Sequence, residues 1–343
     1  MARVVVTGAA GPLGRKVRTL LADRDDVSSV VGIDLLAVTG RGVEEHRLDL
    51  VTADLDEAFA GADAVLHLAS AFGPRFEGPE IEAAADVTMA RRVLDAAGKA
   101  GAGTVVLLSS ATVYGPWPNN PVPITEEAPL RPHPDLAFAV QMAEIERLAA
   151  EWSAGHPSTT VARLRPATVV GSDGSWLAEA LDAVSGLPPG EETPAQYLHI
   201  DDLAAAVVVA FAQRLDGPVN VAPSGWLTPT ERQALDPIPK LRLPENAALK
   251  AADLRWRLGL APTTPGVVAY ARHPWVVAND RLVAAGWAET NSNEEAYVAG
   301  HEASAIEKVS PQRRQELALG VSAGVIAAVV GGIVAVVRHR RRR

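Results

Sequence analysis

Short apolar segments alternate along the chain with longer segments in which apolar residues recur every three or four positions. The short segments predict buried β-strands, and the longer ones predict helices that cover a sheet. The predicted strands are residues 2–7, 28–34, 63–68, 104–109, 159–164 and 218–221, and the predicted helices are residues 12–23, 80–100, 135–154, 176–185 and 201–214. This alternation predicts an α/β fold with a Rossmann-type, doubly wound parallel sheet.

The regular alternation ends near residue 223. Before that point, residues 115–134 contain seven prolines and predict a loop across the top of the sheet, where a ligand is expected. We therefore predict a Rossmann-type domain over residues 1–223. Prolines interrupt the pattern beyond it, which predicts a small C-terminal substrate lobe over residues 224–300 and a polar linker over 301–316.

The C-terminal part of the chain contains an apolar segment of a different kind. Residues 317–337 are 21 residues without a charge, long enough as a helix to cross the ~30 Å hydrocarbon layer of a bilayer. A buried core helix is the alternative, but a helix that is uncharged on every face at this position favours a transmembrane helix. We expect it to anchor the protein in a membrane, with the basic tail at 338–343 among lipid phosphates.

Composition removes several classes of function. The chain has 343 residues, no cysteine and a formal net charge of −9. The absence of cysteine excludes disulfides, thiolate metal sites and cysteine nucleophiles, and no other cluster has metal-ligand spacing. Five of the 32 basic residues lie in the basic tail, so the rest of the chain has 27 basic against 41 acidic residues. Such an acidic body argues against nucleic acid as a partner.

The first predicted strand leads into a glycine-rich turn and a helix. Thr7 is followed by Gly8, Gly11 and Gly14, and Asp34 ends the second predicted strand. In this context the glycines let the backbone approach a pyrophosphate at the helix N-terminus, and the acid accepts hydrogen bonds from the adenine ribose. An ordinary glycine-rich turn would not explain Asp34. Because Asp34 would repel a 2′-phosphate, the expected cofactor is NAD.

Several motifs resemble, in the right order, the extended short-chain dehydrogenase/reductase family, which contains the NAD-dependent epimerases and dehydratases of sugar nucleotides. Besides the glycine turn they are His67-Leu68-Ala69-Ser70, Ser109-Ser110-Ala111-Thr112-Val113-Tyr114-Gly115, Leu164-Arg165-Pro166 followed by Gly171, and His199-Ile200-Asp201-Asp202-Leu203-Ala204. The resemblance extends to about residue 221. It implies a cofactor site formed by Thr7, Gly8, Gly11, Gly14, Asp34, Asp49, Leu68, Ala69, Ser109 and Pro166.

The same resemblance reveals a missing pair of residues. In the family, a Lys lowers the pKa of a Tyr four residues before it, and the phenolate takes a substrate proton while hydride passes to NAD. The serine that assists them corresponds to Ser110, but Phe138 and Met142 stand at the Tyr and Lys positions. No tyrosine of this chain is followed by a lysine four residues later, and no lysine lies between Lys99 and Lys240. Standard family catalysis is therefore not expected.

Other family positions also differ. Asp86, Met89 and Ala90 stand where the family usually has Asn, Gly and Thr. Ala195 stands where many nucleotide-sugar epimerases have an Arg for substrate phosphates. A sugar nucleotide is therefore not supported as the ligand.

A few side chains have two interpretations. Tyr114 is either structural or a replacement hydroxyl, and His133 is a candidate acid–base. Next to His199, we expect Asp201 or Asp202 to cap the following helix. The tryptophans considered for a pocket wall, although single tryptophans more often belong to a core or its rim, are Trp117, Trp176 and Trp226.

Two functions follow from these observations. The first is a membrane-anchored NAD-binding protein without standard redox catalysis: a sensor, scaffold or regulator whose small-molecule or protein partner the sequence does not identify. The second is an NAD-dependent epimerase/dehydratase or dehydrogenase whose acid–base lies elsewhere. The missing Tyr–Lys pair favours the first.

The apolar C-terminal segment bears on orientation and self-association. Its basic tail is more positive than the flank at 308–314, which by itself favours a cytoplasmic tail. A requirement for NAD favours the opposite orientation, with the NAD-binding domain in the cytoplasm, and we expect this one. Gly320 and Gly324 form a small-xxx-small step that is compatible with a homodimer, although small residues are also simply frequent in membrane helices.

Overall fold

A seven-stranded parallel sheet forms the centre of the protein. The computed structural model describes residues 1–40, 42–71, 79–171, 176–184, 193–235, 250, 254 and 266–300. The strands lie in the order β3-β2-β1-β4-β5-β6-β9. Their bounds are β1 Ala2–Thr7, β2 Val27–Asp34, β3 Val43–Arg47, β4 Ala64–His67, β5 Thr104–Leu108, β6 Thr160–Pro166 and β9 Gly217–Val221. The order reverses direction at β1, so the fold is the predicted Rossmann-type, doubly wound sheet.

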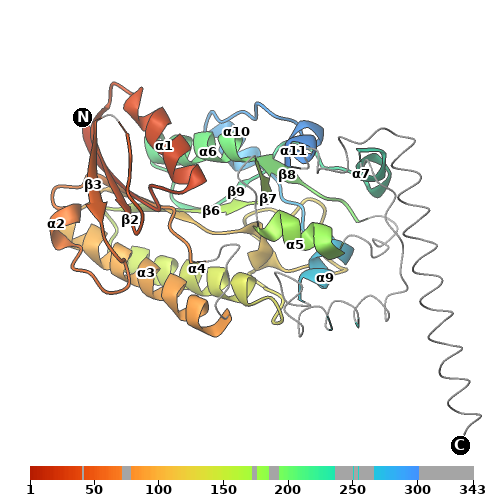
Figure 1. Ribbon diagram of the computed structural model, residues 1–343. Coiled ribbons are helices and arrows are strands. Elements are labelled where there is room, and N and C mark those ends of the chain that lie inside the picture. The colour runs from red at the N-terminus through yellow and green to blue at the C-terminus, as the bar shows by residue number, and fades with distance from the viewer. Residues whose placement is uncertain are drawn as a thin grey trace, which may run out of the picture. The chain divides into compact units, whose positions relative to one another are not determined.

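Helices cover both faces of this sheet (Figure 1). Helices α1 (Pro12–Ala22) and α6 (Ile200–Ala212) lie on one face, and α3 (Pro79–Ala100) and α4 (Ala137–Gly155) lie on the other. Side chains alternate between the faces of a strand. In β1, Val4 and Val6 therefore belong to the core under α1 and α6, whereas Val5 belongs to the core under α3 and α4.

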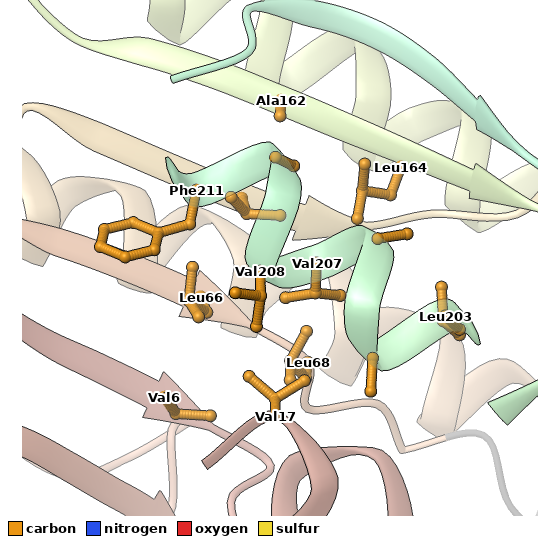
Figure 2. Packing of buried hydrophobic residues seen from close by; sticks show 14 of the residues in the cluster. Val6, Val17, Leu66, Leu68, Ala162, Leu164, Leu203, Val207, Val208 and Phe211 are labelled. Atoms are coloured by element: carbon orange, nitrogen blue, oxygen red, sulfur yellow. The ribbon is translucent and has the colours of Figure 1, made fainter. Parts of the chain in front are cut away.

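Figure 2 shows how α6 fills the first of these cores. Val207, Val208 and Phe211 of α6 are buried among residues of the sheet, including Leu66 of β4 and Leu164 of β6. Burying an aliphatic or aromatic side chain of this size stabilises a fold by roughly 1.5–3 kcal/mol. The packing of α6 therefore stabilises the sheet, and ligands of folds of this type bind at the carboxyl ends of its strands.

The six predicted strands and five predicted helices are confirmed, and no end differs by more than two residues. One of the five predicted helices is α5 (Trp176–Val184). The remaining elements are α2 (Asp56–Phe59), the 3-10 helix η1 (Ala111–Tyr114), β7 (Thr168–Val170), β8 (Tyr197–His199), α7 (Pro229–Leu235), α9 (Val267–Arg272), α10 (Asp280–Ala284) and α11 (Asn293–Gly300). The pattern missed β3 because this edge strand reads Val-Glu-Glu-His-Arg. Such a strand is half-solvated and carries no continuous apolar run.

Residues 1–300 form one compact unit. The second half of the substrate-lobe region packs back on the sheet domain, since Val277 forms a β-bridge with Ile124. The boundary predicted at residue 223 stays a prediction. The predicted linker, transmembrane helix and basic tail, at 301–316, 317–337 and 338–343, lie outside the described residues. Within the described part of the chain, no helix is long and apolar enough to cross a bilayer.

Candidate functional site

The turn after β1 is built so closely that only glycine fits at two of its positions. Gly8 has a φ of +70°, and a Cβ there would lie 2.7 Å from the Ala69 backbone nitrogen. A Cβ on Gly14 would lie 2.1 Å from the Gly8 carbonyl oxygen. Gly11 is the N-cap of α1, and among the described residues no side chain caps the N–H groups of the first turn of this helix. This cradle suits a pyrophosphate.

Asp34 lies at the end of β2, beside the same turn. Its Oδ2 accepts a hydrogen bond from the Ala10 N–H at 2.9 Å, and its Oδ1 accepts one from the Leu36 N–H at 3.0 Å. A carboxylate offers about four acceptor positions. The half-buried Asp34 carboxylate therefore keeps acceptor capacity for ribose hydroxyls while the turn holds it in place. We call Gly8, Gly11, Gly14 and Asp34 the glycine-turn site.

Two further residues that the resemblance assigned to the cofactor are held by contacts of their own. The Thr7 hydroxyl shares a hydrogen bond of 2.7 Å with Nδ1 of His67. Burial lowers the pKa of His67 to about 4, so this imidazole is neutral at pH 7. Asp49 accepts hydrogen bonds from the Val51 N–H at 2.8 Å and the Thr52 hydroxyl at 2.8 Å, which close its own turn.

A second feature, which we call the apolar cavity, lies where β5 and β6 end and has a volume of about 340 Å³. Six residues predicted for the cofactor or catalytic site line it together: Ala69, Ser109, Ser110, Phe138, Met142 and Pro166. The structure thus brings the positions of the family's Ser, Tyr and Lys into one cavity. The side chains at two of these three positions are apolar.

Helices α4 and α5 supply five apolar residues of the wall. On α4, Phe138, Met142 and Ile145 share one face because they are four and three residues apart. From α5, Trp176 meets Phe138 edge to face, with ring centroids 4.7 Å apart. Among the three tryptophans considered for a pocket wall, Trp176 is the one that lines this cavity. The helical spacing could have revealed Ile145, but no local signal pairs Trp176 with Phe138.

A buried polar network lies behind the cavity. Glu146 accepts a hydrogen bond from the Ser109 hydroxyl at 2.7 Å, and it forms an ion pair with Arg165 in which both side chains are almost fully buried. Arg165 also donates to the Tyr114 hydroxyl at 2.6 Å, and this hydroxyl donates to Asn220 Oδ1 at 2.7 Å. Although burial opposes it, hydrogen bonding to Glu146 raises the pKa of Arg165. The network braces β5, β6, β9 and α4 against one another.

This network decides between the two interpretations of Tyr114. Its hydroxyl is committed to Arg165 and Asn220, and burial raises the pKa of Tyr114 to about 12. Tyr114 does not line the apolar cavity. The geometry therefore supports the structural role and not a replacement hydroxyl.

His133 and the proline-rich loop also lie away from the cavity. The His133 ring stacks on Trp117, with centroids 5.8 Å apart, and the backbone N–H of His133 donates to the Tyr270 hydroxyl at 3.2 Å. Residues 115–134 contribute nothing to the cavity wall. They run instead beside residues 276–278, where Ile124 exchanges backbone hydrogen bonds of 2.8 and 2.9 Å with Val276 and Ala278. The expectation that this loop lies over the ligand is wrong for the cavity described.

The prediction for the cap of α6 is also wrong. The side chain of His199, and not that of Asp201 or Asp202, caps this helix, because His199 Nδ1 accepts from the Asp201 N–H at 3.3 Å. Asp202 is buried and binds a distant segment. Its carboxylate accepts from the Thr290 and Asn291 N–H groups at 2.8 and 3.0 Å. A sequence pattern reveals a cap position but not a partner almost ninety residues away.

No group of three or more His, Asp or Glu side chains is arranged to hold a metal ion within the described ranges.

Comparison with known proteins adds a family and several relatives. A statistical model of the NAD dependent epimerase/dehydratase family matches residues 4–222. Uncharacterized proteins of Mycobacterium tuberculosis and Mycobacterium bovis are 28% identical over 236 residues, which are 65% of this chain and 63% of theirs. The chain thus spans less than two thirds of the length of these curated relatives.

Solved structures share the fold. MoeE5 in complex with UDP-glucuronic acid and NAD is 22% identical with a TM-score of 0.65, covering 88% of this chain and 98% of that one. The UDP-glucose 4-epimerase of Thermus thermophilus in complex with NAD is 21% identical with a TM-score of 0.64, covering 87% and 97%. At this identity the likeness extends to the fold alone.

Proposed function

The chain belongs to the NAD dependent epimerase/dehydratase family, its cofactor is NAD, and we propose that it is a membrane-anchored member without the family's redox catalysis. It would act as a sensor, scaffold or regulator. Its bound NAD would stabilise the structure or serve as a signal. One observation carries this proposal: the cavity that brings together Ser110 and the Tyr and Lys positions presents Phe138 and Met142.

The glycine-turn site supports NAD binding. Gly8 and Gly14 allow the turn to pack in a conformation that other residues cannot adopt, and Asp34 keeps free acceptor positions beside it. Solved structures with the same fold hold NAD in complex. These groups bind and orient the adenine half and the pyrophosphate, while the chemistry that NAD supplies when bound is hydride transfer.

The side chains of the apolar cavity support the loss of catalysis. Phe138 keeps the ring of the family's Tyr without its hydroxyl, and Met142 keeps the length of the Lys without its charge. Among the described residues that line the cavity, the ionisable ones are His67 and Asp86. His67 is neutral and bonded to Thr7, and Asp86 accepts hydrogen bonds from the Ala71 N–H and the Ser70 hydroxyl. Neither replaces a phenolate that is free to take a proton.

Calorimetry and a turnover assay on the full-length chain test the proposal. NAD should bind, and no NADH should appear with a panel of alcohols and sugar nucleotides. The double variant Phe138→Tyr with Met142→Lys restores the family's pair and should raise any residual turnover by roughly 10²–10⁴-fold. Phe138→Tyr with Val140→Lys is the matched control, because Val140 lies on the exposed side of the same helix. Substantial turnover by the unmodified chain would instead support an enzyme with a relocated acid–base.

The uncharged segment at 317–337 supports membrane anchoring, with the NAD-binding domain on the cytoplasmic side. A variant that lacks residues 317–343 should move from the membrane fraction to the soluble fraction and still bind NAD. Replacing Gly324 by Ile should weaken a dimer, if one forms through this segment, without releasing the protein from the membrane. A shortened chain that still sediments with membranes would contradict the anchor.

A further inference from the structure

The wall of the apolar cavity indicates what kind of ligand it takes beside NAD. Its wall includes aliphatic, aromatic and thioether side chains from three helices, among them Phe138, Met142, Ile145, Trp176, Leu177 and Ile200. Its volume of about 340 Å³ is within the range of small-molecule sites. Binding to a wall of this composition becomes more favourable when the ligand buries hydrocarbon against it. Binding becomes less favourable when the ligand buries polar groups there without partners.

The described residues of the cavity wall offer no cationic partner for a phosphate. None of the described residues that line it is Lys or Arg, whereas Asp86 contributes a buried carboxylate. A sugar nucleotide carries two phosphate charges, and burying them against an apolar wall without a cationic partner is strongly unfavourable. The described wall therefore argues against the class of ligand that a family resemblance would suggest first.

Ser110 provides one polar contact of defined direction. Its Oγ accepts hydrogen bonds from the Thr112 N–H at 3.2 Å and the Thr112 hydroxyl at 3.0 Å. A serine oxygen has two acceptor positions and one O–H donor. With both acceptor positions occupied, the O–H is what Ser110 can offer to a molecule in the cavity. An oxygen that only accepts, such as a ketone carbonyl, matches this group.

We propose that the apolar cavity binds a neutral, mainly hydrocarbon molecule that presents one carbonyl oxygen to the Ser110 hydroxyl. The proposal deepens the proposed function, on which it rests for the presence of NAD beside the cavity. It assigns the ligand by three features of the wall: an apolar lining, the absence of a cationic side chain among the described lining residues, and the directed donor of Ser110.

Two probes of the same shape test it. Dicyclohexyl ketone and dicyclohexylmethane differ only in the carbonyl. Each is titrated into the full-length chain in phospholipid nanodiscs with saturating NAD, and empty nanodiscs correct for partition into lipid. Tryptophan fluorescence reports binding, and Trp176→Phe identifies the residue that gives the signal. We expect the ketone to bind roughly two- to tenfold more tightly than the hydrocarbon, as one neutral hydrogen bond allows. Ser110→Ala should remove this preference.

A second variant keeps the test decisive if Ser110→Ala disturbs the cap of η1. Met142→Lys places an ammonium in the cavity and should weaken both probes more than tenfold. Val140→Lys adds the same charge on the exposed side of α4 and should change neither affinity.

The outcomes separate this proposal from the proposed function, because calorimetry measures NAD binding in the same preparation. Failure of both probes to bind, or tighter binding of UDP-glucose that displaces the ketone, overturns the apolar-ligand proposal while NAD binding stands. Binding of the ketone without binding of NAD overturns the proposed function and leaves the assignment of the cavity intact.

Discussion

The glycine-turn site and the apolar cavity lie at the carboxyl ends of strands of one sheet, yet their chemistry differs. The first keeps bare backbone and a carboxylate that suit a dinucleotide. The second keeps Ser110 but has Phe138 and Met142 at the two positions where the family has its Tyr and Lys. Binding of a cofactor and transfer of a proton therefore depend on separate groups, and one can be retained when the other is lost. Four predictions test this contrast, from the largest expected effect to the smallest.

Gly14→Ala should abolish the glycine-turn site. The new Cβ would lie 2.1 Å from the Gly8 carbonyl oxygen, and a backbone oxygen cannot move aside without moving the turn. Returning the shifted turn to the shape that binds NAD should cost about 4 kcal/mol or more. This cost corresponds to a loss of NAD affinity of roughly 10³-fold or greater. Calorimetry with NAD measures it. In the control Gly155→Ala, the new Cβ meets no atom within 4 Å, and NAD affinity should be unchanged.

Glu146→Gln tests whether the buried polar network behind the apolar cavity still stabilises the fold. It would leave the buried Arg165 without its carboxylate, and breaking a buried ion pair in this way costs roughly 3–5 kcal/mol. The free energy of unfolding, measured by denaturant titration, should fall by that amount. Glu144→Gln removes an exposed carboxylate that pairs with Arg147 on the same helix, and it should cost less than about 1 kcal/mol. Equal losses for the two variants would contradict a structural role for the network.

His67 lies where β1 and β4 end, and it should make the free energy of unfolding depend on pH. Burial lowers its folded-state pKa to about 4, against an ordinary value of about 6.5. Between these values the unfolded chain binds a proton that the folded chain does not, so stability falls as pH falls through this window and is fully present above it. The loss should approach about 3 kcal/mol. Unfolding titrations at pH 7 and pH 4 should show a smaller difference for His67→Gln, and identical differences would refute the assignment.

Asp34→Ala should have the smallest effect of the four. It removes one charged acceptor from the glycine-turn site but leaves the cradle intact, so NAD should bind about 1.5–3 kcal/mol less favourably. Asp26→Ala, just before the opposite end of β2, is the control and should leave the affinity unchanged. Unchanged affinity in Asp34→Ala would place the adenine ribose elsewhere. A loss as large as that of Gly14→Ala would mean that Asp34 holds the turn together.

The sequence by itself determined the features that are local or that depend on an inventory. The strand–turn–helix–strand that carries Gly8, Gly14 and Asp34 is continuous in the chain, and each strand and helix has its own apolar period. The absence of a Tyr–Lys pair needed no structure, because no lysine lies between Lys99 and Lys240.

The tertiary structure alone decided which distant side chains meet. Phe138 packs on Trp176, Tyr114 is bonded to Arg165 and Asn220, and Asp202 holds residues 290 and 291. Periodicity shows which face of an element is buried, but it does not show which other element covers that face. The contacts that turn Tyr114 into a structural residue and α4 into a cavity wall exist only once helices and strands remote in the chain pack together.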